Sequence, residues 1–171
     1  FRLGSGGQYQ GAIVGDNGAM AATQNGGAAW TTRASSTNEP LMGVDFVSTS
    51  VGYVTADSDV LKTTDSGASW SALGDSGSSS LLDVDFKDTG KGWAVGRAGT
   101  AYYYNGSSWT LIDSGMSPGR DLYSVCYIDA TNIWVCGDVG TIAKSTGTSW
   151  TMSSDADVTS GLWRSIDFFD T

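Results

Sequence analysis

The strongest constraint on the fold is a repeat of about 40 residues. Four tryptophans (Trp30, Trp70, Trp109 and Trp150) lie 40, 39 and 41 residues apart, and each ends a similar polar segment. The four segments are residues 25–30, 65–70, 105–109 and 146–150. One apolar landmark precedes each tryptophan, as residues 93–96 precede Trp109, and a second recurs at residues 44–46, 84–86, 125–127 and 166–168. Landmarks that recur in a fixed order predict tandem copies of one small module.

Each module predicts four short β-strands, because runs rich in Val, Ile, Tyr, Trp and Thr alternate with clusters of Gly, Asp and Ser. In the third module we expect strands at 82–86, 92–95, 100–104 and 108–112. Two glycines bracket the turn between the second and third of these strands, as tight hairpins require. No segment has a helical period. The prediction is an all-β protein, a β-propeller of about four four-stranded blades.

The ends of the chain suggest how the propeller closes. The chain opens in mid-module, at a second strand near residues 11–15, and finishes with a lone first strand at 162–168. We therefore expect one domain, residues 1–171, whose closing blade is shared between the N- and C-termini and has no exposed edges. The expected blades are 162–171 plus 1–33, 41–73, 81–112 and 122–153. Two alternatives are a part of a longer propeller and a homo-oligomer whose chains exchange strands.

Composition excludes several classes of function. The chain has no His, which rules out imidazole general bases, Ser-His-Asp systems and His-ligated metals. Nine Lys and Arg stand against eighteen Asp and Glu, so a nucleic-acid partner is not expected. Every acidic residue except Glu39 is an aspartate. Turn chemistry explains that bias, and halophilic adaptation is the alternative.

The cysteines and the ends of the chain lead to expectations about the cellular location of the protein. Cys126 and Cys136 fall on neighbouring expected strands, which leaves both a cross-strand disulfide and two buried thiols open. No apolar run reaches the ~18 residues of a membrane helix, and no basic leader is present. We expect a soluble protein without membrane insertion. Because the chain starts at Phe1 rather than Met, we expect a processed or trimmed product, with a secreted, periplasmic or lumenal location as the alternatives.

Residues 63–70 (Thr-Thr-Asp-Ser-Gly-Ala-Ser-Trp) resemble the Asp-box of the bacterial neuraminidase repeat (BNR), and residues 23–30 form a weaker copy. The whole module, with Gly-Trp-Ala-Val-Gly at 92–96, is similar to the repeat of photosystem II stability/assembly factors over almost the entire chain. The resemblance implies a structural turn in which the acid caps backbone N–H groups and the tryptophan packs between blades. The residues it marks are Thr23, Asn25, Gly27, Trp30, Thr63, Asp65, Gly67, Trp70, Trp109 and Trp150.

The same resemblance implies a protein partner bound through an arginine-rich patch. Here the arginines are spread over different modules, at Arg2, Arg33, Arg97, Arg120 and Arg164. Sialidases of this repeat class have an arginine trio, a nucleophilic tyrosine and a longer chain, an arrangement not found here. The repeat names a scaffold, and function has to be argued from a site.

The first candidate site is a loop face. In a propeller, the turns between second and third strands share one face with the links between blades, and the Asp-boxes lie on the other. The hairpin tips on this face carry Asp16, Asp57, Arg97 and Asp138, and its polar links are residues 34–39, 74–80, 113–120 and 153–161. These loops would bind a partner, unless they are merely solvated turns.

The second candidate is a set of carboxylates at equivalent positions of the first strands: Asp45, Asp85 and Asp167, with Cys126 in the fourth place. Converging near the axis, they would hold Ca²⁺ or another hard cation, or act as the acid and base of an inverting glycosidase, whose carboxyls stand about 6.5 to 9.5 Å apart. The alternative is a solvated channel or a hydrogen-bonded contact between blades. Tyr103 is a further candidate, for stacking on a sugar or a partner protein.

The sequence thus favours a non-enzymatic binding or scaffold propeller that presents an acidic loop face to a protein partner. No catalytic residue is assigned and no cofactor is required. The alternative is a carbohydrate-binding or glycoside-cleaving propeller that uses the central carboxylates.

Overall fold

The computed structural model describes residues 2–3, 9–75, 80–112, 119–153 and 160–168. These residues form sixteen strands joined by turns and links. They form four antiparallel sheets of four strands, which we number as blades one to four. Blade one has β1 (Arg2–Leu3), β2 (Tyr9–Val14), β3 (Met20–Thr23) and β4 (Thr31–Thr32); blade two has β5 (Leu41–Phe46), β6 (Gly52–Ala56), β7 (Asp59–Thr63) and β8 (Ser71–Asp75). Blade three has β9 (Leu81–Asp88), β10 (Lys91–Gly96), β11 (Ala101–Tyr104) and β12 (Trp109–Leu111); blade four has β13 (Leu122–Asp129), β14 (Asn132–Gly137), β15 (Ile142–Ser145) and β16 (Trp150–Met152).

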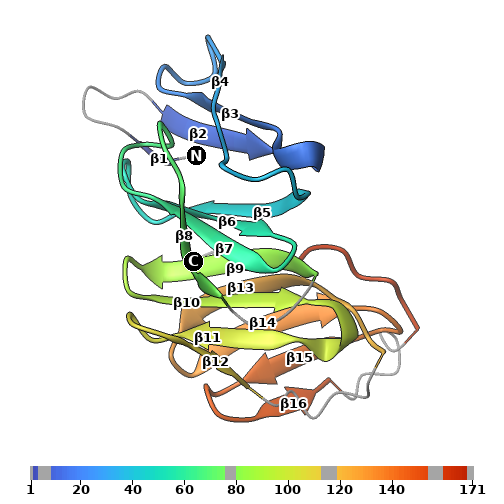
Figure 1. The fold of residues 1–171 in the computed structure, drawn as a ribbon. Helices are drawn as coiled ribbons and strands as arrows, with labels where there is room; N and C mark the ends of the chain where they lie inside the picture. Colours follow the sequence, from blue (N-terminus) through green and yellow to red (C-terminus); the bar gives the residue numbers. More distant parts are fainter. Residues whose placement is uncertain (1, 4–8, 76–79, 113–118, 154–159, 169–171) are drawn as a thin grey trace.

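Each blade is a meander whose strands lie side by side in chain order (Figure 1). This arrangement confirms the all-β class and the four-stranded blades expected from the repeat. In blade three the expected strands agree with β9 to β12 to within two residues at each end. The alternation in β9 shows why the segment is a strand: Val84 and Phe86 are buried, and Asp85 between them is half-buried.

The core lies between successive blades, at three contacts that we call joints. At the first joint, blades one and two bury Met20, Leu41, Phe46, Val54, Ala56, Leu61 and Trp70. The second joint packs Tyr53 and Val60 against Phe86 and Ala94. The third packs Trp93 and Val95 against Val125 and Val135 in the same way. The first strands of blades two to four, β5, β9 and β13, lie next to one another along the stack, and we call them the inner strands.

The sharing of the first blade between the two termini stays a prediction. Among the described residues, β1 pairs with β2, and residues 160–168 contain no strand. The C-terminal segment lies against blade four, where the backbone N–H of Trp163 donates to the carbonyl oxygen of Gly137 at 3.1 Å. Blades one and four stand at opposite ends of the row of described blades (Figure 1).

Both cysteines are free, buried thiols, so the disulfide alternative is not realised. They lie on paired strands, but Cys126 stands opposite Trp134 and Cys136 opposite Ser124. No helix in the described part of the chain has the length and apolar character needed to traverse a bilayer.

Candidate functional site

The carboxylates of the inner strands tie each blade to the next. Asp45 Oδ2 accepts a hydrogen bond from the backbone N–H of Phe86 at 3.0 Å. Asp85 Oδ2 accepts one from the backbone N–H of Tyr127 at 2.6 Å. These partners are 41 and 42 residues apart, which is one module, so the same bond recurs at successive joints. Of the roles considered for Asp45 and Asp85, the hydrogen-bonded contact between blades is the one that this geometry supports.

Sequence reasoning missed Asp83, which has no acidic counterpart in the other modules. Its Oδ2 accepts from the hydroxyl of Ser124 at 2.8 Å and from the backbone N–H of Val125 at 3.0 Å. Gly43 leaves room for it, since a Cβ there would lie 2.8 Å from Asp83 Oδ1. The signal available in the sequence was this pairing of an extra aspartate in one inner strand with a glycine in its neighbour.

Burial perturbs the pKa of Asp83 and of Asp85 in blade three. It raises the pKa of Asp83, against the opposing effect of the hydrogen bonds from Val125 and Ser124. Burial also raises the pKa of Asp85 to about 6, and the negative charges of Asp45, Asp83 and Asp167 add to the shift. The joint is therefore sensitive to pH between the ordinary range of an aspartate and neutrality.

Asp167, the third predicted carboxylate, is exposed and accepts from the backbone N–H of Phe168 at 2.9 Å. Cys126 stands in the place of Asp85 in the last inner strand, and its Sγ lies 4.0 Å from Asp167 Oδ1. Burial raises the pKa of this thiol. No group of three His, Cys, Asp or Glu side chains within the described ranges is placed to hold a metal ion.

The loop face is formed by three similar turns and by the links between blades. In the turn after β10, Ala98 has φ of +53° and Gly99 of +76°, a conformation that glycine adopts without strain. The turns at residues 15–18 and 137–140 repeat it. Asp16 and Arg97 are exposed at their tips, whereas Asp57 and Asp138 are half-buried.

Hydrogen bonds join these turns to the neighbouring link, residues 119–121, in a continuous rim over blades three and four. Arg97 Nη1 lies 3.4 Å from Asp121 Oδ2, and Asp121 Oδ1 accepts from the backbone N–H of Ala98 at 3.0 Å. The backbone N–H of Asp121 donates in turn to Asp138 Oδ2 at 3.3 Å. Arg120 Nη1 donates to the carbonyl oxygen of Val139 at 3.1 Å. The turns are thereby fixed relative to one another.

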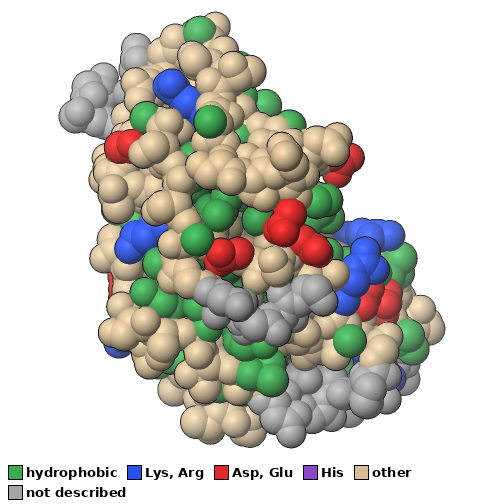
Figure 2. All heavy atoms as spheres, in the orientation of Figure 1, with side chains coloured by type: hydrophobic (Ala, Val, Ile, Leu, Met, Phe, Trp, Pro, Cys, Tyr) green, Lys and Arg blue, Asp and Glu red, His purple; other side chains and the backbone are tan. Residues whose placement is uncertain are grey.

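The rim also gathers arginines that are scattered in the sequence. The guanidinium of Arg164 lies over the ring of Tyr123 at 4.8 Å. Burial raises the pKa of Tyr123, and the charges of Asp138, Asp121 and Arg164 also act on it. Figure 2 shows basic and acidic side chains next to one another along the right-hand edge of the molecule. The face that we expected to be acidic therefore carries both charges in its described part. Sequence spacing missed this because the arginines come from a hairpin turn, a link between blades and the C-terminal segment.

The Asp-box segments lie at the opposite ends of the sheets. The hydroxyl of Thr63 donates to Asp65 Oδ1 at 2.8 Å and accepts from the backbone N–H of Gly67 at 3.0 Å, while Asp65 Oδ1 accepts from the N–H of Ser69 at 2.9 Å. Thr23, Asn25 and Gly27 make the corresponding bonds in blade one. The ring of Trp70 packs edge-on against Phe46. The geometry is that of a turn held by its own hydrogen bonds.

Trp109, Trp150 and Tyr103 also lie at joints. Trp109 contacts Phe86, and Trp150 packs edge-on against Trp93 with ring centroids 5.5 Å apart. Trp30 differs, because 39% of its surface is exposed. Tyr103 is half-buried beside Trp93 and lines a cavity of about 160 Å³ at the third joint. Its ring thus contributes to packing between blades three and four.

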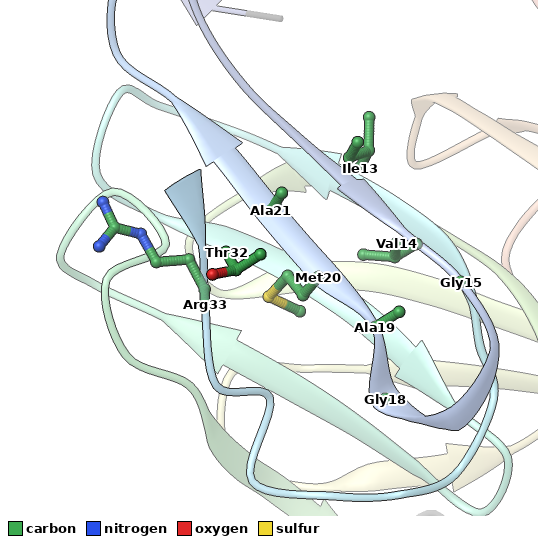
Figure 3. A pocket seen from close by; sticks show the side chains of 9 residues that line it. All are labelled: Ile13, Val14, Gly15, Gly18, Ala19, Met20, Ala21, Thr32 and Arg33. Atoms are coloured by element: carbon green, nitrogen blue, oxygen red, sulfur yellow. The ribbon is translucent and has the colours of Figure 1, made fainter. Parts of the chain in front are cut away.

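A cavity of about 400 Å³ lies on blade one (Figure 3). It is an open apolar groove lined by β2, β3 and the residues after β4, including Ile13, Val14, Met20 and Ala21. None of the predicted site residues lines it.

No family model matches the chain, and no curated protein matches it. Among solved structures it is similar to YCF48 from Cyanidioschyzon merolae, with 17% identity over 86% of this chain and 56% of that chain and a TM-score of 0.64. It is also similar to YCF48 bound to D1 peptide (16% identity, 89% of this chain, 80% of that chain, TM-score 0.52). An ancestral GH74 enzyme matches as well (18% identity, 91% of this chain, 25% of that chain, TM-score 0.62).

The chain thus spans little more than half the length of the first of these structures, 56% of it. At identities of 16 to 18% the likeness shows the fold: the four blades are arranged as in a β-propeller of the YCF48 kind.

Proposed function

We propose that this chain is a non-enzymatic binding propeller that holds a polypeptide partner on its loop face. The observation that carries the proposal is the rim over blades three and four, where Arg97, Arg120 and Arg164 come together with Asp121 and Asp138. The rim combines charged side chains with a backbone held by its own hydrogen bonds. Groups that are ordered before binding lose less conformational entropy when a partner arrives.

The chemistry of the rim suits a polypeptide. The side chain of Arg97 is 62% exposed although it contacts Asp121, and a guanidinium offers several N–H donors to a carboxylate of a partner. Arg164, also exposed, is oriented by the ring of Tyr123. The acidic residues of the same face, Asp16 among them, would pair with basic groups. A surface with interspersed charges selects its partner by matching a charge pattern.

The comparison with YCF48 bound to D1 peptide supports this proposal, because that propeller has the same kind of blade and binds a peptide. The inner carboxylates support it too. One carboxylate oxygen of Asp45 and one of Asp85 accept a hydrogen bond from the next blade. Both residues are therefore poorly placed for acid–base catalysis on a substrate.

Selection from a random peptide library on the immobilised chain tests the proposal. We expect peptides that bind the unaltered chain and lose at least tenfold in affinity with Arg97→Gln or Arg164→Gln, about 1.4 kcal/mol or more. Lys91→Gln is the matched control, since it removes an exposed charge from the opposite ends of the sheets. Peptides that respond equally to all three substitutions, or no selected peptide at all, would contradict the proposal.

The likeness to a GH74 enzyme and the raised pKa of Asp85 favour glycoside binding or cleavage as the second candidate. A glycan array and a hydrolysis screen on the unaltered chain and on Asp85→Asn separate the two. A sugar product that the substitution abolishes would replace the proposal above. Glycan binding without turnover would point to a carbohydrate-binding propeller.

A further inference from the structure

The second and third joints pack their aromatic rings differently. At the second joint the ring of Tyr53 stacks on that of Phe86, with the centroids 3.4 Å apart and the two planes 2° from parallel. The Tyr53 hydroxyl donates to the carbonyl oxygen of Thr89 at 2.9 Å, and Nζ of Lys62 lies 3.4 Å from the same oxygen. A flat phenolic ring that belongs to the chain itself thus fills the second joint at this end of the sheets.

The strand register identifies the corresponding residues of the third joint. The residues that correspond to Tyr53, Lys62, Phe86, Thr89 and Gly92 are, in the same order, Trp93, Tyr103, Tyr127, Ala130 and Ile133. All five positions have changed, although both joints are built from the same module. The chemistry of the two joints therefore differs at the same five places.

The change from glycine to isoleucine explains why the stack is not repeated. The ring of Phe86 lies directly over Gly92, where an added Cβ would collide with it. Ile133 carries a side chain at the corresponding position and is 1% exposed. The ring of Tyr127 therefore cannot occupy the place that the ring of Phe86 occupies in blade three.

The tryptophan of the third joint does not restore the stack. Trp93 packs against Tyr103 and, edge-on, against Trp150, with ring centroids 5.3 and 5.5 Å away. Within the described residues, no aromatic ring stacks on Tyr127. The ring in the place of Phe86 thus lacks the partner that Tyr53 provides one joint earlier.

A cavity of about 160 Å³ lies among these residues. It is lined by the five changed positions together with Gly147 and Thr148. Trp93 and Ile133 form its buried wall, and Ala130 and Thr148 are exposed at its mouth. An engineered cavity of roughly 150 Å³ in another protein binds benzene. The cavity therefore has room for a single six-membered ring.

The lining is uncharged and offers hydrogen-bonding groups. No charged side chain lines the cavity. Burial raises the pKa of Tyr127 to about 12, and the phenol of Tyr103 adds to the shift, so the Tyr127 hydroxyl keeps its proton at neutral pH. The buried indole N–H of Trp93 has no acceptor among the described residues, and none of these residues donates to the carbonyl oxygen of Ala130. A phenol can accept from an N–H and donate to a carbonyl, whereas a hydrocarbon ring can do neither.

A sugar suits this lining less well than a phenol does. A pyranose carries several hydroxyls, and each one costs free energy when it is buried without a partner. The side-chain hydroxyls that line the cavity are those of Tyr103, Tyr127 and Thr148, and the other side chains there are aromatic or aliphatic. A ring with one hydroxyl matches this small number of polar groups.

We propose that the cavity binds one uncharged phenolic ring from outside the chain, which lies against Tyr127 and donates its hydroxyl proton to the carbonyl oxygen of Ala130. The ligand takes the place that Tyr53 has at the second joint. A free phenol and the tyrosine side chain of a polypeptide share this chemistry, and the open mouth leaves a polypeptide backbone outside. The cavity lies at the Asp-box ends of the sheets, so the inference is independent of what the loop face binds.

Nuclear magnetic resonance titration of the unaltered, isotope-labelled chain with phenol tests the proposal. We expect saturable shifts of the Trp93 indole N–H signal and nuclear Overhauser contacts between the phenol ring and the methyl groups of Ile133. The absence of binding would overturn the proposal. Contacts with Ile13 and Met20, in the groove of blade one, in place of Ile133 would overturn it too.

Two further ligands are titrated in the same way. N-acetyl-tyrosinamide distinguishes the sources: contacts from its ring to Ile133 support a tyrosine side chain, and binding of phenol alone supports a free phenol. Glucose tests the competing class of ligand. Glucose that binds at Ile133 when phenol does not would overturn the proposal.

Two matched variants test the position of the ligand. Ala130→Phe adds a ring at the mouth of the cavity and should weaken phenol binding at least about tenfold. Thr89→Phe makes the same kind of change at the corresponding exposed position of the second joint, which Tyr53 already fills, and should leave the affinity unchanged. Thermal unfolding checks that both variants are folded, and the Overhauser contacts of the unaltered chain decide the question if one is not. Equal weakening by both variants, or unchanged binding to Ala130→Phe, would overturn the proposal.

Discussion

Blades one and three start from the same module, yet the two sheets have different surroundings. In blade three, both faces of the sheet are covered, and Trp93, Ala94 and Val95 are no more than 1% exposed. In blade one, the face that carries Ile13 is open. The bulkier of the two equivalent apolar residues, Ile13 rather than Ala94, is the exposed one. Burial in this chain is therefore set by the presence of a neighbouring blade more than by the residue at a given position.

The largest expected effect comes from removing a large buried side chain at a joint between two blades. Phe86 is 2% exposed and stacks on Tyr53 with ring centroids 3.4 Å apart, so Phe86→Ala should lower the free energy of unfolding by about 3 to 5 kcal/mol. Ile13→Ala, measured in dilute protein, should change it by less than about 0.5 kcal/mol. Denaturant unfolding at equilibrium measures both. Equal losses would show that blade one is as enclosed as blade three.

Two equivalent glycines sharpen the comparison. Gly96→Ala places a Cβ against Ser80 and Leu81 and should destabilise the chain by about 1 to 3 kcal/mol. Gly15→Ala meets no atom within 4 Å and should leave stability unchanged or slightly raised. Both glycines are extended, with φ of −173° at Gly15 and −166° at Gly96, so conformational strain does not distinguish them. Thermal unfolding of the two variants, measured in parallel, tests this difference in stability, and equal unfolding temperatures would contradict it.

The carboxylate at the third joint predicts a dependence on pH. The pKa of Asp85 in the folded chain is about 6, above the ordinary 3.8, so the folded state binds the proton more tightly than the unfolded state. Its contribution to stability is present below about pH 4 and is lost as the pH rises through 6. Asp85→Asn keeps an acceptor for the N–H of Tyr127 and cannot ionise, so it should be more stable than the unaltered chain at pH 7, by about 2 kcal/mol.

Unfolding midpoints from pH 4 to 8 measure that difference, and Asp167→Asn is the control at the open end of the stack, where the equivalent carboxylate is exposed. If the unaltered chain and Asp85→Asn showed the same dependence of stability on pH, the assignment of that dependence to Asp85 would be contradicted.

The smallest expected effect concerns the Asp-boxes. Hydrogen bonds from the hydroxyl and the N–H of Ser69 lower the pKa of Asp65 to about 2. Its contribution is therefore present above about pH 4 and is lost as the pH falls toward 2. Asp65→Asn should abolish the loss of stability at low pH. It should change stability little at pH 7, since Asn25 makes corresponding bonds in blade one without a charge. Acid titration followed by tryptophan fluorescence checks the outcome.

Much of the fold could be predicted from the sequence, because a repeated module repeats its turns and its alternation of apolar residues. The spacing of the box tryptophans gave the blades, and the pattern around Val84 and Phe86 gave the inner strands. The partner of the last strand stays a prediction, because a lone strand matches the first blade and the place after the fourth equally well as a pattern.

The candidate site was harder to predict for a related reason. Equivalent positions indicated Asp45 and Asp85, but a one-dimensional pattern does not show whether a carboxylate faces a channel or the backbone of the next blade. Asp83 was missed because it breaks the repeat. Arg97 was predicted from its place at a hairpin tip, but its grouping with Arg120 and Arg164 was missed because the three come from segments far apart in the chain. Departures from the repeat, compared between neighbouring modules, carry information that the shared pattern lacks.

The bond from an inner-strand carboxylate to the next backbone N–H has a consequence for how such a chain can lengthen. The donor is a main-chain group that every residue except proline supplies, so the acceptor places little demand on the sequence of the unit that follows. A duplicated blade can therefore accept the same hydrogen bond from the blade that follows it. A chain can gain or lose whole blades without a new contact surface having to evolve.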